Sequence, residues 1–193
     1  MHPSDGEAVI LECLHSGWLP LDETLPWTIN GVEVSPATRT RREEYHWAAG
    51  WCFGNNILDA ATGYVDTWHM LPEILTRKQP LRRVVGIDMN PATLLMPKSQ
   101  PVLRMLGNLC SLPFAAAAFD TVYCISTLEH LTPPEVRAAA SELLRVCKWR
   151  LVLTADHANW LPELFGFGIG DKLPEQGMLN PPVYAMVLDI VER

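Results

Sequence analysis

The middle of the chain repeats one pattern: a short apolar run that ends in an acidic or polar residue, then a turn and a helix-like segment. The run Arg83–Asp88 (RVVGID) is the clearest example, because its apolar residues are consecutive rather than alternate. A strand of this kind is buried on both faces, as the central strands of a parallel sheet are. Such strands in alternation with helices predict an α/β fold with helices on both faces of a parallel sheet.

The same pattern gives the expected elements and their order along the chain. Strands are expected over residues 56–60, 83–88, 102–109, 119–126, 150–155 and 184–192. Helices are expected over 36–49, 65–77 and 133–146, the last with Thr132 as its N-cap and Glu135 completing a capping box. The length of 193 residues suits one domain with a core and is short for two. We therefore expect an N-terminal extension over residues 1–35 and a single domain over residues 36–193.

Charge, cysteine usage and hydropathy argue against several classes of protein. A net charge of −7 disfavours nucleic acid as a partner. The five cysteines are widely spaced and form no CxxC pair, so we expect no disulfide framework, no metal site and a reducing, cytoplasmic location. No signal peptide is visible at the N-terminus, and no apolar stretch approaches the 18 residues of a membrane span.

Ligands of a doubly wound sheet bind beyond the carboxyl ends of its strands, so the residues just after each strand are candidates for a site. Gly63 follows the first run and allows either a tight turn close to a ligand or a plain end to the strand. Asp88 ends the second run, where its carboxylate can accept hydrogen bonds from two ribose hydroxyls or cap the helix that follows. The residues alone leave both alternatives open.

Four segments, in order, resemble motifs of the class I S-adenosyl-L-methionine (SAM)-dependent methyltransferases, and of their large subgroup that acts on small molecules and lipids. The segment Glu142–Val146 is similar to the helix before the fifth strand of that family, and the whole resemblance covers about residues 40–156. The four motif segments are Ile57–Gly63, Val84–Asn90, Gly107–Phe114 and Phe119–Leu131.

This resemblance implies a Rossmann-like, doubly wound and mostly parallel sheet of seven strands. The implied strand order is 3-2-1-4-5-7-6, with strand seven antiparallel. The segment after the fifth strand is short, so either Leu161–Ile169 supplies strand six or the sheet is trimmed there.

The resemblance also implies SAM as the cofactor and assigns roles around its methionine and ribose. Asp59 would orient the loop near the methionine amine, and Gly63 would pass close to the methionine or ribose part. Asp88 would hold the ribose hydroxyls, and Met89 would pack on the adenine.

Three further residues receive roles from the same resemblance. Asn108 would accept a hydrogen bond from the adenine amino group, and the Leu109 amide would reach the ring. Ser126 would line the pocket through its backbone.

The glycine-rich loop departs from the family pattern. Three glycines are usual, at the positions of Ala61, Gly63 and Val65, and only the middle one is present. Ala61 remains a cofactor-binding candidate, since an alanine is a small change there provided that its φ is negative.

The expected function is methyl transfer from SAM to an unidentified small-molecule or lipid/glycan-type acceptor. His130, after the fourth strand, is the candidate catalytic base, although a histidine there also suits a structural role in the loop. The alternative is a catalytically degenerate SAM-binding or regulatory domain. A nicotinamide-dependent dehydrogenase is a third class, but its GxGxxG loop is absent from ATGYVDT. No motif in the sequence identifies the acceptor or the oligomeric state.

Overall fold

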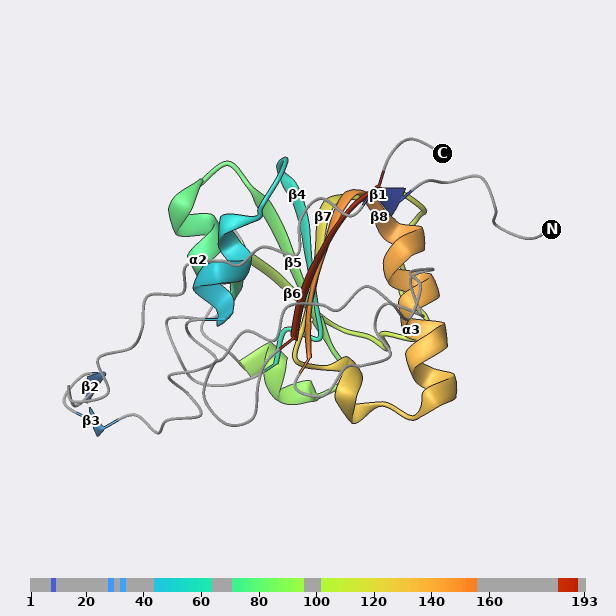
Figure 1. Ribbon diagram of the computed structural model, residues 1–193. Coiled ribbons are helices and arrows are strands. Elements are labelled where there is room, and N and C mark those ends of the chain that lie inside the picture. The colour runs from blue at the N-terminus through green and yellow to red at the C-terminus, as the bar shows by residue number, and fades with distance from the viewer. Residues whose placement is uncertain are drawn as a thin grey trace.

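The structure of the chain is a computed structural model. It describes residues 8–9, 28–29, 32–33, 44–63, 71–95, 102–155 and 184–190, and the statements below concern these residues. Figure 1 shows one main sheet with helices to either side.

The main sheet has seven strands in the order β1-β9-β8-β7-β4-β5-β6. Five neighbouring strands of this sheet run parallel to one another, namely β8, β7, β4, β5 and β6. A separate antiparallel pair joins β2 (Thr28–Ile29) to β3 (Val32–Glu33). The strands of the main sheet are β1 (Ala8–Val9), β4 (Asn56–Ala60), β5 (Arg83–Asp88), β6 (Val102–Leu106), β7 (Phe119–Ile125), β8 (Cys147–Ala155) and β9 (Tyr184–Ile190).

This topology confirms the predicted Rossmann-like class. In chain order β4, β5, β6, β7 and β8 are the first five strands of the expected 3-2-1-4-5 arrangement, and β9 is the antiparallel strand beside them. The outermost position beside β9 is taken by β1, which pairs with it antiparallel through Ala8↔Ile190. The segment Leu161–Ile169, the candidate for strand six, lies outside the described residues. The division between residues 1–35 and 36–193 stays a prediction.

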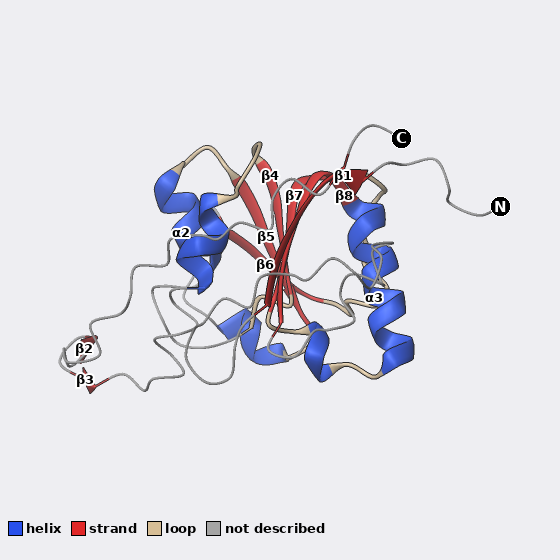
Figure 2. Ribbon diagram, in the orientation of Figure 1, coloured by secondary structure: helices blue, strands red, loops and turns tan. Residues whose placement is uncertain are grey.

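Two helical layers cover the sheet, as Figure 2 shows. The helical residues 44–50 and α2 (Leu71–Lys78) lie on one face, and α3 (Pro133–Val146) lies on the other. Because β4 lies between them, its side chains alternate between the two cores: Ile57 packs with the α2 side and Leu58 with the α3 side.

Two short 3-10 helices, η1 (Pro91–Leu95) and η2 (Leu128–His130), follow β5 and β7. Both lie at the lower end of the sheet in Figure 1, which is therefore the carboxyl edge of the parallel strands. The turn after β4 opens at the same edge, so the candidate residues that follow these strands are gathered there, as predicted.

Element ends differ slightly from the prediction. β6 ends at Leu106, three residues earlier than expected, and β8 begins at Cys147, three residues earlier. At the start of α3 the predicted capping box is present, and the Thr132 amide donates to the Glu135 carboxylate at 2.9 Å. The Thr132 hydroxyl donates to the same carboxylate at 2.6 Å, and this hydrogen bond, with that of the amide, lowers the pKa of Glu135.

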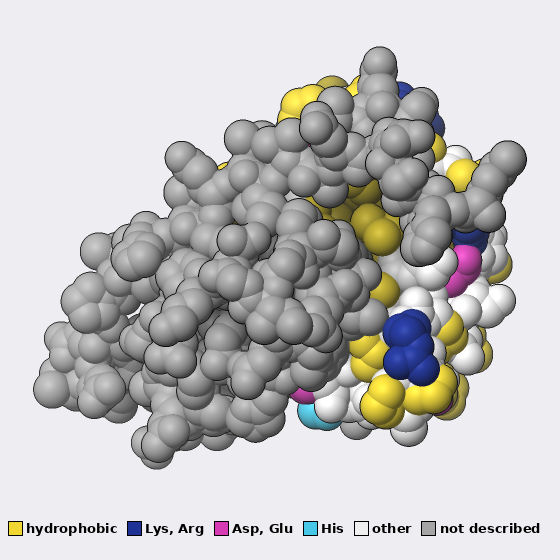
Figure 3. Space-filling model, turned by 45° about the vertical axis from the view of Figure 1, so that its right-hand side comes forward, with side chains coloured by type: hydrophobic (Ala, Val, Ile, Leu, Met, Phe, Trp, Pro, Cys, Tyr) yellow, Lys and Arg dark blue, Asp and Glu magenta, His cyan; other side chains and the backbone are white. Residues whose placement is uncertain are grey.

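Several large apolar side chains of the described residues are exposed. On the face drawn in Figure 3, hydrophobic groups reach the surface beside Lys and Arg side chains. Single exposed apolar residues are normal on protein surfaces. Within the part of the chain that the structure describes, no helix has the length and hydropathy needed to cross a membrane. The large hydrophobic residues that are exposed are Phe53, Leu81, Met89, Leu94, Leu95, Leu103 and Leu106.

Candidate cofactor site

The turn after β4 is built on a buried carboxylate. Asp59 is 2% exposed, and its Oδ2 accepts a 2.7 Å hydrogen bond from the Thr62 hydroxyl. Burial raises the pKa of Asp59 to about 7, against the opposing effects of this hydrogen bond and of the Arg104 charge. Thr62 lies over Gly86. A Cβ atom on residue 86 would stand only 3.0 Å from the hydroxyl oxygen of Thr62. The glycine in β5 therefore makes room for the threonine that holds Asp59.

The backbone of this turn is left-handed at two positions. Ala61 has a φ of +66° and Gly63 a φ of +74°. The amides of Ala61 and Thr62 both donate to the Ile87 carbonyl, at 2.8 and 3.0 Å, which holds the turn against the end of β5. The condition stated for Ala61, a negative φ, is therefore not met. An alanine here stands in a conformation that glycine adopts at much lower cost.

Asp88 joins the two loops that border the candidate site. Its Oδ2 accepts from the Gly63 amide at 2.8 Å, and its Oδ1 accepts from the Asn90 amide at 2.8 Å. The helix that follows is capped by Asn90, whose side-chain oxygen accepts from the Ala92 amide at 2.9 Å, while Oδ2 of Asp88 faces the turn after β4. Each carboxylate oxygen accepts up to two hydrogen bonds, so both keep capacity for a hydroxyl donor. Met89 beside it is 77% exposed, and its side chain is available to pack on a planar group.

Asn108 and Leu109 begin the loop after β6. The Asn108 side-chain oxygen accepts a 2.8 Å hydrogen bond from the Cys110 amide, so it caps its own turn. Leu109 is 9% exposed and packs in the core on the α3 side. Asn108 itself is exposed, and its carbonyl accepts from the Ser111 amide at 3.0 Å.

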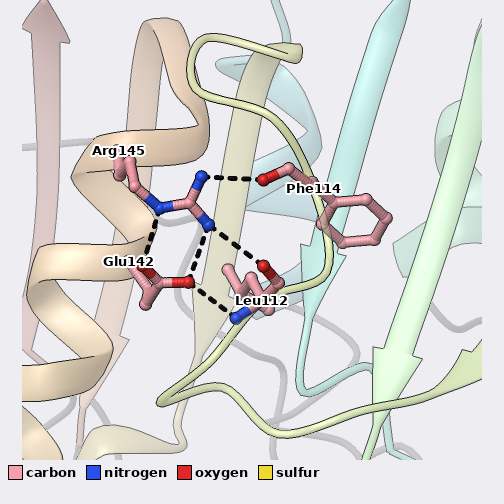
Figure 4. A network of polar contacts seen from close by, with 4 residues as sticks. All are labelled: Leu112, Phe114, Glu142 and Arg145. Atoms are coloured by element: carbon pink, nitrogen blue, oxygen red, sulfur yellow. Dashed lines mark hydrogen bonds and ion pairs between the residues drawn. The ribbon is translucent and has the colours of Figure 1, made fainter.

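An ion pair on α3 anchors the far end of the same loop (Figure 4). The Arg145 guanidinium donates to the carbonyls of Phe114 and Leu112, at 2.7 and 3.0 Å. The Glu142 carboxylate accepts a hydrogen bond from the guanidinium at 2.6 Å and another from the Leu112 amide at 2.7 Å. Three backbone groups of the loop are therefore fixed by two side chains that lie one helical turn apart. These side chains come from the segment Glu142–Val146 of the predicted resemblance.

Ser126, which follows β7, is also left-handed, with a φ of +43°. Its amide donates to the Thr154 carbonyl at 2.9 Å, and its hydroxyl donates to Glu44 Oε1 at 2.6 Å. The Thr154 hydroxyl donates to the same oxygen of Glu44. Glu44 is 1% exposed and lies in the helical residues 44–50, so this cluster ties that helix to the ends of β7 and β8.

No sequence pattern pointed to Glu44 or Thr154 as functional residues. Glu44 stands in the charged run RREE, which is typical of a solvated helix face, and Thr154 is one residue of an apolar strand. Only the pairing of β7 with β8, in which Ile125 faces Thr154, brings the hydroxyl to Ser126.

His130 is exposed at the end of η2, and its amide donates to the Thr127 carbonyl at 3.0 Å. It lies at the carboxyl edge of the sheet with the other candidates, but no described contact of its ring distinguishes a catalytic role from a structural one. Among the described residues, no group of three or more His, Cys, Asp or Glu side chains is placed to hold a metal ion.

The loops described above lie together at the carboxyl edge of a doubly wound sheet, where the ligands of such folds bind. Residues 58–150 match the family model described as "Methyltransferase domain". This match confirms the predicted resemblance to the class I SAM-dependent methyltransferases over this segment, and the sheet order agrees with it. No curated protein sequence matches the chain significantly.

Solved structures share the fold at low sequence identity. The PH0226 protein of Pyrococcus horikoshii superposes with a TM-score of 0.58 at 18% identity, over 81% of this chain and 92% of that one. A SAM-dependent methyltransferase of Methanosarcina mazei gives 0.47 at 22% identity, over 69% and 63%. The Haloferax volcanii protein solved with the Trm112 methyltransferase activator gives 0.49 at 15%, over 63% and 55%. The chain thus spans about half the length of some of the structures that it matches.

Proposed function

We propose that the chain binds SAM and transfers its methyl group to a small-molecule or lipid/glycan-type acceptor. The observation that carries the proposal is the placement of Asp88, whose carboxylate stands at the end of β5 against the Gly63 amide. A carboxylate there, with capacity for further hydrogen bonds, suits the two vicinal hydroxyls of a ribose. The exposed Met89 next to it suits the apolar face of an adenine.

Residues at this edge of the sheet would contact SAM from one end of the cofactor to the other. Asp88 and Met89 would hold the ribose and the adenine, with the loop that starts at Asn108 along the adenine edge. Asp59 and the left-handed turn through Ala61 and Gly63 would border the methionine part. Ser126 would border the cofactor on the side of β7.

When bound, SAM would supply an electrophilic methyl group on a sulfonium sulfur, which an acceptor displaces in line. The protein has to align the acceptor with that methyl group and to exclude water. Where the acceptor is a hydroxyl, it must also lose a proton, and His130 is the described residue that we propose to accept it. The left-handed turn at Ser126, held by Glu44 and Thr154, would fix the start of the segment that carries His130.

A second candidate function is a SAM-binding domain without catalysis, and Ala61 is the observation that favours it. An alanine at a φ of +66° costs about 1–2 kcal/mol, which a chain selected for tight cofactor binding would avoid with glycine. We propose in addition a reducing, cytoplasmic location, supported by four free cysteines among the described residues.

Formation of S-adenosylhomocysteine distinguishes the two functions. The purified chain would be incubated with SAM and pooled alcohols, phenols, amines and lipids, and the product measured by mass spectrometry. Methyl transfer that is lost in His130→Gln but kept in the control His46→Gln, an exposed histidine of the helical residues 44–50, would support catalysis with His130 as base. SAM binding with no turnover on any pool would favour the binding domain.

A further inference from the structure

Three residues on neighbouring strands form one row across the α2 face of the sheet. Asp59 in β4 pairs with Gly86 in β5, and Gly86 pairs with Arg104 in β6. Residues in register on adjacent strands project from the same face. Gly86 has no side chain, so β5 places none between Asp59 and Arg104. The space above the glycine is filled by Thr62, from the turn after β4.

Arg104 is paired with a second carboxylate, from the helix that covers this face. Its guanidinium forms an ion pair with Glu73 of α2, and the two side chains are 7% and 10% exposed. One buried cation therefore serves two buried carboxylates, Glu73 through direct contact and Asp59 across the glycine. The Arg104 charge favours the ionised form of Asp59, while the Glu73 charge opposes it.

We propose that Arg104 and Glu73 are positioning residues that set the charge of Asp59, so that binding of the cationic cofactor releases a proton from Asp59 to solvent. The inference depends on the proposed binding of SAM. No bond other than the carboxyl O–H breaks, and the proton passes to water or buffer. SAM carries a sulfonium and an ammonium against one carboxylate, so its net charge is about +1 and favours an ionised Asp59 nearby.

The surroundings of Asp59 support this coupling. Its carboxyl has a pKa of about 7, mainly because it is buried, so that both charge states are populated at neutral pH. Burial raises the pKa of Tyr123 well above its ordinary value, so its hydroxyl stays neutral beside Asp59. Arg104 is then the cation that faces Asp59, and the remaining neighbours are acidic. The titratable and charged groups that face Asp59 are Asp88 from β5, Arg104 from β6, Glu73 from α2 and Tyr123 from β7.

Two substitutions that break the same ion pair separate an electrostatic role from a structural one. Removing the Glu73 charge in Glu73→Gln should lower the pKa of Asp59, whereas removing the guanidinium in Arg104→Met should raise it. A merely structural role would move both variants in the same direction. Arg104→Lys, which keeps the charge, should stay close to the wild type. The double variant removes both charges of the ion pair, and its Asp59 pKa should fall between those of the two single variants.

The first measurement is calorimetric titration of SAM at pH 7 in buffers of different ionisation enthalpy. The slope of the apparent enthalpy gives the number of protons released, which we expect to be about half a proton for the wild type. Release should fall in Glu73→Gln and rise in Arg104→Met. Binding without proton release, or the same change in both variants, overturns the inference.

The second measurement needs no cofactor and separates this inference from the proposed function. The carbon-13 shift of the Asp59 carboxyl would be titrated between pH 4 and 9 in the ligand-free wild type and in both variants. Opposite changes of the Asp59 pKa in the two variants support the roles of Arg104 and Glu73, even in a protein that does not bind SAM. Absence of SAM binding would by itself overturn the proposed function and the proton coupling. Unshifted or parallel titrations overturn the inference even where SAM binds.

Discussion

The carboxylate of Glu44 accepts a 2.6 Å hydrogen bond from the hydroxyl of Ser126, 82 positions further along the chain. With Thr154 it forms a buried cluster that joins a helix, a strand end and the turn after β7. Buried carboxylates are tolerated where donors satisfy them, so each hydroxyl of the cluster contributes to its stability.

Ser126→Ala should therefore lower the free energy of unfolding by roughly 1–3 kcal/mol, because a hydrogen bond to a buried charged group is lost. The matched control is Ser141→Ala on the exposed side of α3, which should stay within about 0.5 kcal/mol of the wild type. Urea unfolding followed by far-UV circular dichroism measures both. Equal stabilities of Ser126→Ala and the control would show that the cluster contributes nothing.

The left-handed backbone of Ala61 leads to a prediction of opposite sign. Ala61→Gly should raise the free energy of unfolding by about 1 kcal/mol or slightly less, since relief at a φ of +66° exceeds the added entropy of the unfolded chain. Ala60→Gly, its neighbour in β4, should lower it by about 1 kcal/mol, because that position is buried extended backbone. Thermal unfolding of both variants tests the pair. A loss of stability in Ala61→Gly would contradict the conformation assigned to this turn.

The raised pKa of Asp59 predicts how stability changes with pH. The folded carboxyl titrates near 7 and the unfolded one near its usual value, so between about pH 4 and 7 the folded state holds the extra proton. The contribution of Asp59 to stability is therefore complete below that window and falls as pH rises through it, at up to about 1.4 kcal/mol per unit. Asp59→Asn removes this term. Its stability relative to the wild type should rise from pH 4.5 to 8, and parallel curves in urea unfolding would refute the assignment.

The anchor of the loop after β6 predicts a local effect rather than a global one. Glu142→Gln should weaken its hydrogen bond to the Leu112 amide and its contact with Arg145, so that this amide exchanges with deuterium faster. Arg137→Lys on an exposed position of α3 is the control and should leave the exchange rate of Leu112 unchanged. An unchanged rate in Glu142→Gln would show that the loop is held by other contacts.

The sequence predicted most of the sheet because parallel strands buried on both faces leave a distinctive apolar run. Arg83–Asp88 was predicted with both ends correct, and Tyr184 was correctly taken as the start of the last strand. Strand ends were placed less well: β6 ends at Leu106, before the turn residues Gly107 and Asn108, whereas the apolar Leu109 had extended the prediction. The pairing of Ala8–Val9 with β9 was missed, because two residues carry no periodicity.

The sequence predicted those residues of the candidate site that lie at or just after the end of a strand. Asp88 and Gly63 were placed at the same edge, and the structure joins them by a hydrogen bond. The backbone conformation of the turns and the contacts between residues far apart in the chain could not be predicted from the sequence. The φ of Ala61 depends on the turn as a whole, and the role of Arg104 depends on register across three strands.

The measurement that tests the central claim most directly is calorimetric titration of the purified chain with SAM, and with S-adenosylhomocysteine, for the wild type, Asp88→Asn and Asp88→Ala. We expect micromolar binding by the wild type, about −8 kcal/mol, weaker binding by Asp88→Asn, which keeps one acceptor oxygen, and none detectable in Asp88→Ala. Folded wild-type protein that binds neither ligand would contradict the proposed function, and so would equal affinity in all three proteins.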